Sequence, residues 1–164
     1  MMQYHAKGNT ILRTHLNVVK VVDGDGFIVS NLFNKEEEEI RLIGIDAPEI
    51  KRCRKLIQDE RETHLAGQLL IELGLLSFNK LKELAPVGAN ISLILQAKNQ
   101  FDTYGRTLAY AFLDDGSCIN EMMLSEGFAK PYSRYNCFMQ YEYQLLFNNA
   151  KVAKNGLLGM VSAF

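Results

Sequence analysis

Alternating apolar and polar positions dominate the stretch from Leu16 to Ile45. This stretch is rich in Val and Ile, and it is interrupted by Gly24, Gly26 and the polar residues 31–39. A period of two indicates strands, and the interruptions indicate the turns between them. We therefore predict three successive antiparallel strands that each bury one face against a shared core. They lie at residues 16–23, 27–33 and 38–45.

The period changes after the basic, irregular residues 50–57. Leu and Ala then recur at intervals of three or four residues over 66–81, which is typical of an amphipathic helix. Asp59 and Glu62 resemble a capping pair at its start, and Pro86 ends it. Gly74 weakens its middle, so a division into two helices is an alternative.

The second half of the chain predicts two further strands and two helices. The strands lie at 90–97 and 106–113, and the helices at 120–126 and 138–154. Five short strands with the longest helix between strands three and four are the element order of an oligonucleotide-binding (OB) fold. We therefore predict an α+β protein, a five-stranded OB-fold β-barrel with about three α-helices. The predicted domain spans residues 16–158, between an N-terminal extension (1–15) and a C-terminal tail (159–164).

Composition narrows the class of protein. The 164 residues are 48% hydrophobic and 23% charged, which is typical of one globular domain. The net charge of −1 means that binding to nucleic acid needs a local concentration of positive charge. Three cysteines, an odd number, argue against a disulfide framework. Without a signal-like or membrane-spanning apolar run we expect no membrane association and a cytoplasmic monomer, or a secreted one if a signal was removed.

Three short strings carry the residues suited to chemistry. VVDGDGFIV places two acids at the first turn, and FDTYGRTLAY places Asp102, Tyr104 and Arg106 at another turn. Such acids often bond only to nearby backbone amides. IRLIGIDAPEI sets Arg41 within an apolar strand, just before Asp46 and Glu49. Strand parity does not bring Arg41 beside Asp46 without a local bend, so an exposed arginine beside two loop acids is the alternative.

Together these strings resemble the staphylococcal-nuclease-like, or thermonuclease, family. The resemblance runs from about Val18 to Leu158 and rests on VVDGDG, RLIGIDAPE and DTYGRTLAY, with GFAKPY and AKNGLL matching more loosely. It implies a Ca²⁺-dependent nuclease that hydrolyses phosphodiester bonds of DNA or RNA with little sequence specificity.

The resemblance also implies a calcium site. Asp25, Asp46 and the backbone carbonyl of Ala47 match the family's ligands, and oxygen ligands suit this cation. The family commonly has Thr where this chain has Gly26, which puts the strength of metal binding in question.

The resemblance also implies which residues bind phosphate, act as the general base and contact the substrate. Arg41 and Arg106 match the phosphate-binding arginines, since guanidinium groups bind phosphate in a bidentate manner. Glu49 matches the general base that takes a proton from the attacking water. Tyr104 and Tyr132 match substrate-binding tyrosines.

Two further residues are candidates from charge alone. Lys51 and Arg52 begin the basic run KRCRK, which supplies positive charge directly after Glu49 and suggests contact with substrate. A solvated loop is the alternative. At the level of function, the rival to a nuclease is a catalytically weak or inactive OB-fold module that binds nucleic acid by aromatic stacking in a positive groove. A protein-interaction domain with an exposed apolar patch is a third class.

Overall fold

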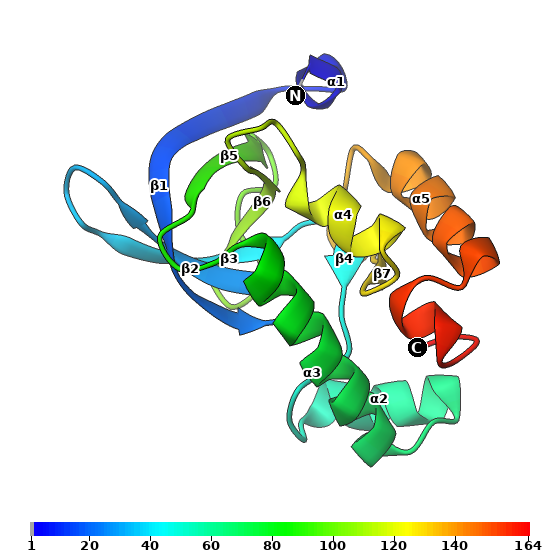
Figure 1. Cartoon of the computed structure of the whole chain (residues 1–164). Helices are drawn as coiled ribbons and strands as arrows, with labels where there is room; N and C mark the ends of the chain where they lie inside the picture. Colours follow the sequence, from blue (N-terminus) through cyan, green and yellow to red (C-terminus); the bar gives the residue numbers. More distant parts are fainter. Residues whose placement is uncertain (1) are drawn as a thin grey trace.

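Five strands close into a barrel in the computed structural model, which describes residues 2–164 (Figure 1). The order around the barrel is β1-β2-β3-β6-β5, and only the β3–β6 pair is parallel. The predicted α+β fold and five-stranded barrel are confirmed, and the architecture is consistent with an OB fold. The barrel strands are β1 (Thr10–Asp23), β2 (Gly26–Asn31), β3 (Glu37–Leu42), β5 (Asn90–Gln96) and β6 (Thr107–Phe112).

A two-stranded sheet lies beside the barrel. It pairs β4 (Ile45–Asp46) with β7 (Lys130–Pro131). The strand predicted over 38–45 is therefore interrupted after Leu42, and its last residue, Ile45, pairs with Pro131 in β7. The interruption contains Gly44, whose φ of 80° is readily adopted only by glycine.

The prediction of about three helices is wrong, because residues 2–164 form five α-helices and a 3₁₀ turn. Two of them, α2 and α3, replace the single helix predicted after the third strand. The chain divides at His64, in the left-handed conformation, and not at Gly74. Asp59 and Glu62 lie within α2 and do not cap it. The helices are α1 (Met2–Ala6), α2 (Arg54–Thr63), α3 (Gly67–Leu84), α4 (Ile119–Ser125), α5 (Gln140–Ala153) and the 3₁₀ turn η1 (Gly156–Gly159).

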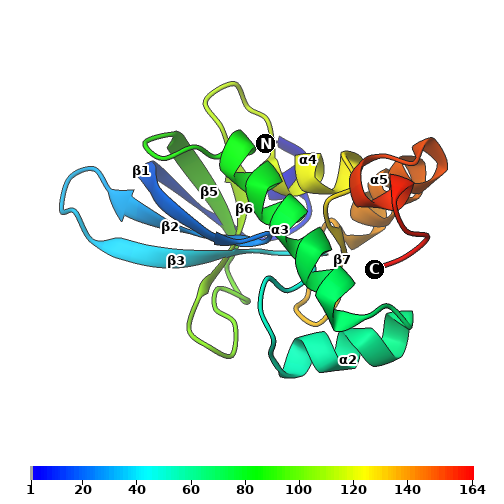
Figure 2. The same ribbon diagram turned by 60° about the horizontal axis from the view of Figure 1, so that its bottom comes forward.

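Gly74 stays within α3 because the chain that follows β4 rests on it. A Cβ atom there would lie 2.5 Å from the carbonyl oxygen of Glu49 and 2.6 Å from that of Pro48. The glycine thus permits close contact between α3 and the loop that carries Glu49. Figure 2 shows α3 crossing in front of the barrel, with α2 below the end of α3 that extends away from the barrel.

Both ends of the described chain pack onto the domain. β1 begins earlier than predicted, and Thr10 already pairs with Gln96 of β5. Tyr4 of α1 is buried, and its hydroxyl contacts the Tyr143 hydroxyl at 3.1 Å. At the other end, Phe164 is buried in a small core cluster beside α5. No helix within residues 2–164 combines the length and the apolar character that a bilayer span requires.

Candidate functional site

A buried arginine joins the two predicted metal-binding acids at the end of β3. Arg41 Nη1 lies 2.8 Å from Asp25 Oδ1, and Nη2 lies 3.4 Å from Asp46 Oδ1. The Gly44 bend makes this possible, because it returns the chain so that β4 ends beside β3. Arg41 Nη2 also donates to the carbonyl of Ile45 at 3.3 Å, which fixes the guanidinium across the bend. The local bend that strand parity requires is therefore present.

Asp25 lies in the turn between β1 and β2. Its Oδ2 accepts a hydrogen bond from the backbone N–H of Ala47 at 3.0 Å, which ties this turn to the loop after β4. The contact of Asp25 with Arg41 Nη1 lacks hydrogen-bond geometry, and Nη1 has no hydrogen-bonded partner among the described residues. Arg41 thus keeps a buried donor, with its guanidinium at the wall of a cavity.

Four acids, Asp23, Asp25, Asp46 and Glu49, lie along one part of the cavity. Burial raises the pKa of Asp23 to about 8, and the neighbouring charge of Asp25 adds to the effect. Burial also raises the pKa values of Asp46 and Glu49. Burial acts in the same direction on Asp25, but the charge of Arg41 overcomes it and lowers the pKa of that carboxyl. An additional cation close to these acids would favour their charged forms.

Lys55 stands among the acids, a position that the sequence did not reveal. Its Nζ lies 2.8 Å from Asp46 Oδ2, 3.0 Å from Asp59 Oδ2 and 3.7 Å from Glu49 Oε1. Burial opposes its charge, but Asp46 raises the pKa of Lys55, so the ammonium form is favoured. Lys55 and Asp59 are four residues apart on α2, a helical spacing that becomes visible only when the helix is known to begin at Arg54.

The opposite wall of the site carries the second arginine. Arg106 immediately precedes β6, and its Nε donates to Asp102 Oδ2 at 2.7 Å. Its guanidinium carbon lies 5.6 Å from the ring centre of Tyr104, and that of Arg41 lies 5.3 Å from the ring centre of Tyr132. Each arginine therefore contacts both a carboxylate and an aromatic ring.

These two walls enclose one cavity of about 660 Å³. Figure 2 shows why distant segments meet there, since the loop before β6, the loop before α2 and the loop after β7 lie on one side of the barrel. Seven predicted site residues line the cavity, namely Asp25, Arg41, Asp46, Glu49, Tyr104, Arg106 and Tyr132. They are joined there by residues that were not predicted, among them Asp23, Lys55, Asp59, Arg134 and Tyr135.

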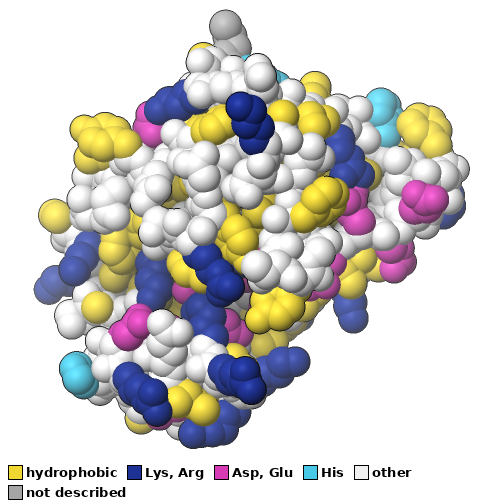
Figure 3. Space-filling view, turned by 180° about the vertical axis from the view of Figure 1, so that it is seen from behind, with side chains coloured by type: hydrophobic (Ala, Val, Ile, Leu, Met, Phe, Trp, Pro, Cys, Tyr) yellow, Lys and Arg dark blue, Asp and Glu magenta, His cyan; other side chains and the backbone are white. Residues whose placement is uncertain are grey.

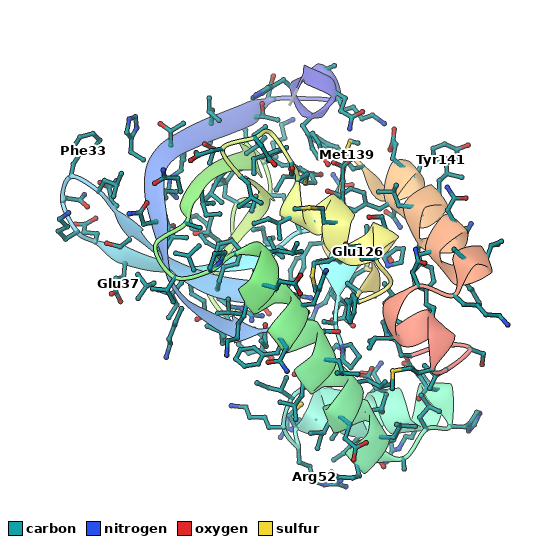
Figure 4. All side chains as sticks on the ribbon, in the orientation of Figure 1. Phe33, Glu37, Arg52, Glu126, Met139 and Tyr141 are labelled. Carbon is teal, nitrogen blue, oxygen red and sulfur yellow. The ribbon has the colours of Figure 1, made fainter. Side chains whose placement is uncertain are left out.

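Lys51 and Arg52 do not line this cavity. Arg52 is 69% exposed at its side chain, pairs with Glu60 at 3.4 Å, and lies at the periphery of the molecule (Figure 4). The neighbouring Arg54 and Lys55 line the cavity instead. Lys and Arg side chains, with Asp and Glu between them, are spread over the lower part of the face in Figure 3. Contact of Lys51 and Arg52 with a long substrate stays a prediction.

A five-stranded barrel with arginines and acids in a cavity at its edge is the arrangement expected of a staphylococcal-nuclease-like protein. Comparison with known families agrees with this class. The chain belongs to the family described as "Staphylococcal nuclease homologue", which matches residues 39–160. Asp25 precedes the matched residues, and the structure places it beside Arg41 in the cavity.

Individual relatives carry nuclease names. An "Uncharacterized endonuclease" of Escherichia coli O157:H7 is 30% identical over 143 residues, which are 87% of this chain and 76% of that protein. "Endonuclease YncB" of Bacillus subtilis is 27% identical over 77% of this chain and 51% of its own length. The "Thermonuclease" of Staphylococcus hyicus is 29% identical over 69% of this chain and 56% of its own length.

Proposed function

We propose that this protein is a Ca²⁺-dependent nuclease that hydrolyses phosphodiester bonds of DNA or RNA with little sequence specificity. The observation that carries the proposal is the convergence of Arg41, Arg106 and Glu49 on one cavity, in a chain of this family. Arginines bind phosphate, and tyrosines stack on bases of any identity, so these cavity groups select a phosphodiester chain and not a base sequence.

The residues present fit a calcium ion. Asp25 and Asp46 supply hard carboxylate oxygens on the same cavity, and such ligands suit a divalent cation. Each of their oxygens already has a protein partner, but a carboxylate oxygen has two lone pairs and can serve a second one. No cluster of three His, Cys, Asp or Glu side chains within residues 2–164 forms a ready ligand set. Asp25, Asp46 and the carbonyl of Ala47 would therefore hold the ion together with solvent and substrate phosphate.

A bound calcium ion would polarise the phosphoryl oxygen and favour ionisation of nearby water. The chain's own residues supply the rest. Arg41, held between two acids, presents its guanidinium at the cavity wall to a phosphate oxygen, and Arg106 approaches from the other wall. Burial raises the pKa of Glu49, which makes this carboxylate a better proton acceptor for the attacking water.

The rival function is a binding module with weak or no catalysis. It is favoured by one observation, that all four carboxylate oxygens of Asp25 and Asp46 face the internal partners Arg41, Ala47 and Lys55. Gly26, where the family has Thr, points the same way. A binder would keep the arginines and tyrosines and would not require the metal.

Incubation of the purified protein with single-stranded DNA, duplex DNA and RNA separates the two functions. We expect cleavage of at least one of them in Ca²⁺ and none in chelator. Retardation of single-stranded DNA in a gel without cleavage in any metal would establish the binding module instead. The protein is proposed to act as a monomer, which analytical ultracentrifugation would check. The expectation of a cytoplasmic location stays a prediction.

A further inference from the structure

The ammonium of Lys55 is surrounded by carboxylates in the way that a bound cation is. Asp46, Glu49 and Asp59 approach it from three parts of the chain, namely β4, the following loop and α2. Its two short contacts, 2.8 Å to Asp46 and 3.0 Å to Asp59, are hydrogen-bond distances to charged groups, which are the stronger ones.

The backbone that carries Lys55 is fixed, whereas its side chain is long and partly exposed. Leu56, the next residue, is fully buried, and its N–H donates to Cys53 Sγ at the start of α2. The Lys55 side chain retains 30% of its exposure, and four rotatable bonds separate its charge from the backbone. Asp59, one turn along the same helix, can hold the ammonium without Asp46.

The carboxylate of Asp46 can therefore bind either of two cations, the ammonium of Lys55 or a divalent metal ion. A carboxylate that is almost fully buried needs a positive partner, and Lys55 supplies it when no metal is bound. Arg41 offers only a longer contact to the other oxygen, at 3.4 Å. A divalent ion that binds Asp46 must then displace the ammonium or share the oxygen with it.

We propose that Lys55 is a tethered counter-ion that competes with the catalytic cation for Asp46. The inference rests on the proposed function in one respect, that Asp46 is a ligand of the cation. Two consequences follow. Lys55 stabilises the acidic site without metal, and it weakens the binding of metal by the same interaction, since the two cations are linked through one carboxylate.

The test measures calcium binding directly. Isothermal titration calorimetry with CaCl₂ is run on the wild type, on Lys55→Met and on Lys51→Met. Methionine keeps the bulk of Lys55 without its charge, and Lys51 is an exposed cation of the same basic run that does not line the cavity. We expect Lys55→Met to bind Ca²⁺ at least about tenfold more tightly than the wild type, because a buried carboxylate has lost its partner, and Lys51→Met to change by less than about twofold. Unchanged or weaker binding by Lys55→Met would overturn the inference.

Thermal denaturation covers the case in which Lys55→Met is unstable. In chelator this variant should melt below the wild type, and Ca²⁺ should raise its melting temperature by more than it raises that of the wild type. If the variant is unfolded in chelator, recovery of the native circular dichroism spectrum on adding Ca²⁺ supports the inference, and failure to recover rejects it. Neither measurement uses cleavage, so absence of nuclease activity would refute the proposed function alone.

Discussion

Asp102 holds the guanidinium of Arg106 while it also closes the turn before β6. Its Oδ2 accepts from Arg106 Nε at 2.7 Å, and its Oδ1 accepts from the backbone N–H groups of Tyr104 and Arg106 at 2.9 Å each. The Asp102 side chain is fully covered, whereas that of Arg106 is 22% exposed. One carboxylate therefore fixes the turn and aims the arginine, and it leaves the terminal nitrogens of Arg106 available to a phosphate.

The substitution Asp102→Asn separates these two tasks. The new amide side chain would keep an oxygen for the turn but would present an N–H to the Nε donor, so Arg106 would lose its orientation. We expect kcat to fall on the order of ten- to a hundredfold, the usual effect of misplacing a positioning group, with a small change in melting temperature. Asp115→Asn is the matched control, since Asp115 makes a similar turn with the N–H of Ser117 away from the cavity. Equal activity of the two variants would contradict the role of Asp102.

Loss of an arginine should reduce turnover at least as much as loss of the candidate base. Arg106→Ala removes a donor to the charge that develops on the phosphate, which typically lowers the rate by about 10²- to 10³-fold. Glu49→Gln removes the proton acceptor but leaves both arginines in place. Single-turnover rates compare the variants, with Arg61→Ala, at an exposed position of α2 outside the cavity, as the control. A near wild-type rate for Arg106→Ala would reject the assignment of Arg106 as a phosphate-binding residue.

Arg41→Ala belongs to the same prediction, but Arg41→Lys is the more informative variant because it keeps a positive charge between the buried acids.

The barrel was predictable because its signals are local. Alternating apolar residues mark each strand, and the turns at Gly24 and Gly105 place acids and an arginine at strand ends. The strings that carry Asp25, Arg41 and Asp46 were recognisable for the same reason. The Gly44 bend that brings the last two together depends on pairing of β4 with β7, which lies far along the chain.

The helices were less predictable because their starts lack the usual side-chain signals. α2 is capped by Cys53, and α3 begins after Ala66 without any side-chain cap, where Ser, Thr, Asp or Asn is common. Asp59 was therefore mistaken for the start of a helix. This error hid the pairing of Lys55 with Asp59, and so the cation among the acids.

Asn120 should be essential to the stability of the bend near Arg41. This fully buried side chain donates to the carbonyls of Ile43 and Ala109 and accepts from the N–H of Ala111. Asn120→Leu keeps the volume but removes this partner from the Ile43 carbonyl and the Ala111 N–H, at about 1 to 3 kcal/mol each, whereas the Ala109 carbonyl keeps its bond from the N–H of Ile43. We expect the free energy of unfolding in urea to fall by at least about 2 kcal/mol. Asn90→Ala, which removes a surface contact to Asp114, should cost less than about 1 kcal/mol. Comparable losses in the two variants would refute this role.

The substitution Gly74→Ala has two opposing effects on stability: it raises the helix propensity of α3, and it crowds the loop that carries Glu49. Alanine favours an α-helix over glycine by about 1 kcal/mol, so an unobstructed position in α3 would gain stability. The added Cβ would instead overlap the carbonyl oxygens of Pro48 and Glu49, and such overpacking costs about 1 to 3 kcal/mol. Backbone atoms cannot rotate away as a side chain can, so we expect lower stability in urea and reduced turnover as the Glu49 loop shifts. Asn79→Ala, at an exposed position of the same helix, should be neutral or stabilising with full activity. A Gly74→Ala variant that is more stable and fully active would show that the loop does not rest on α3.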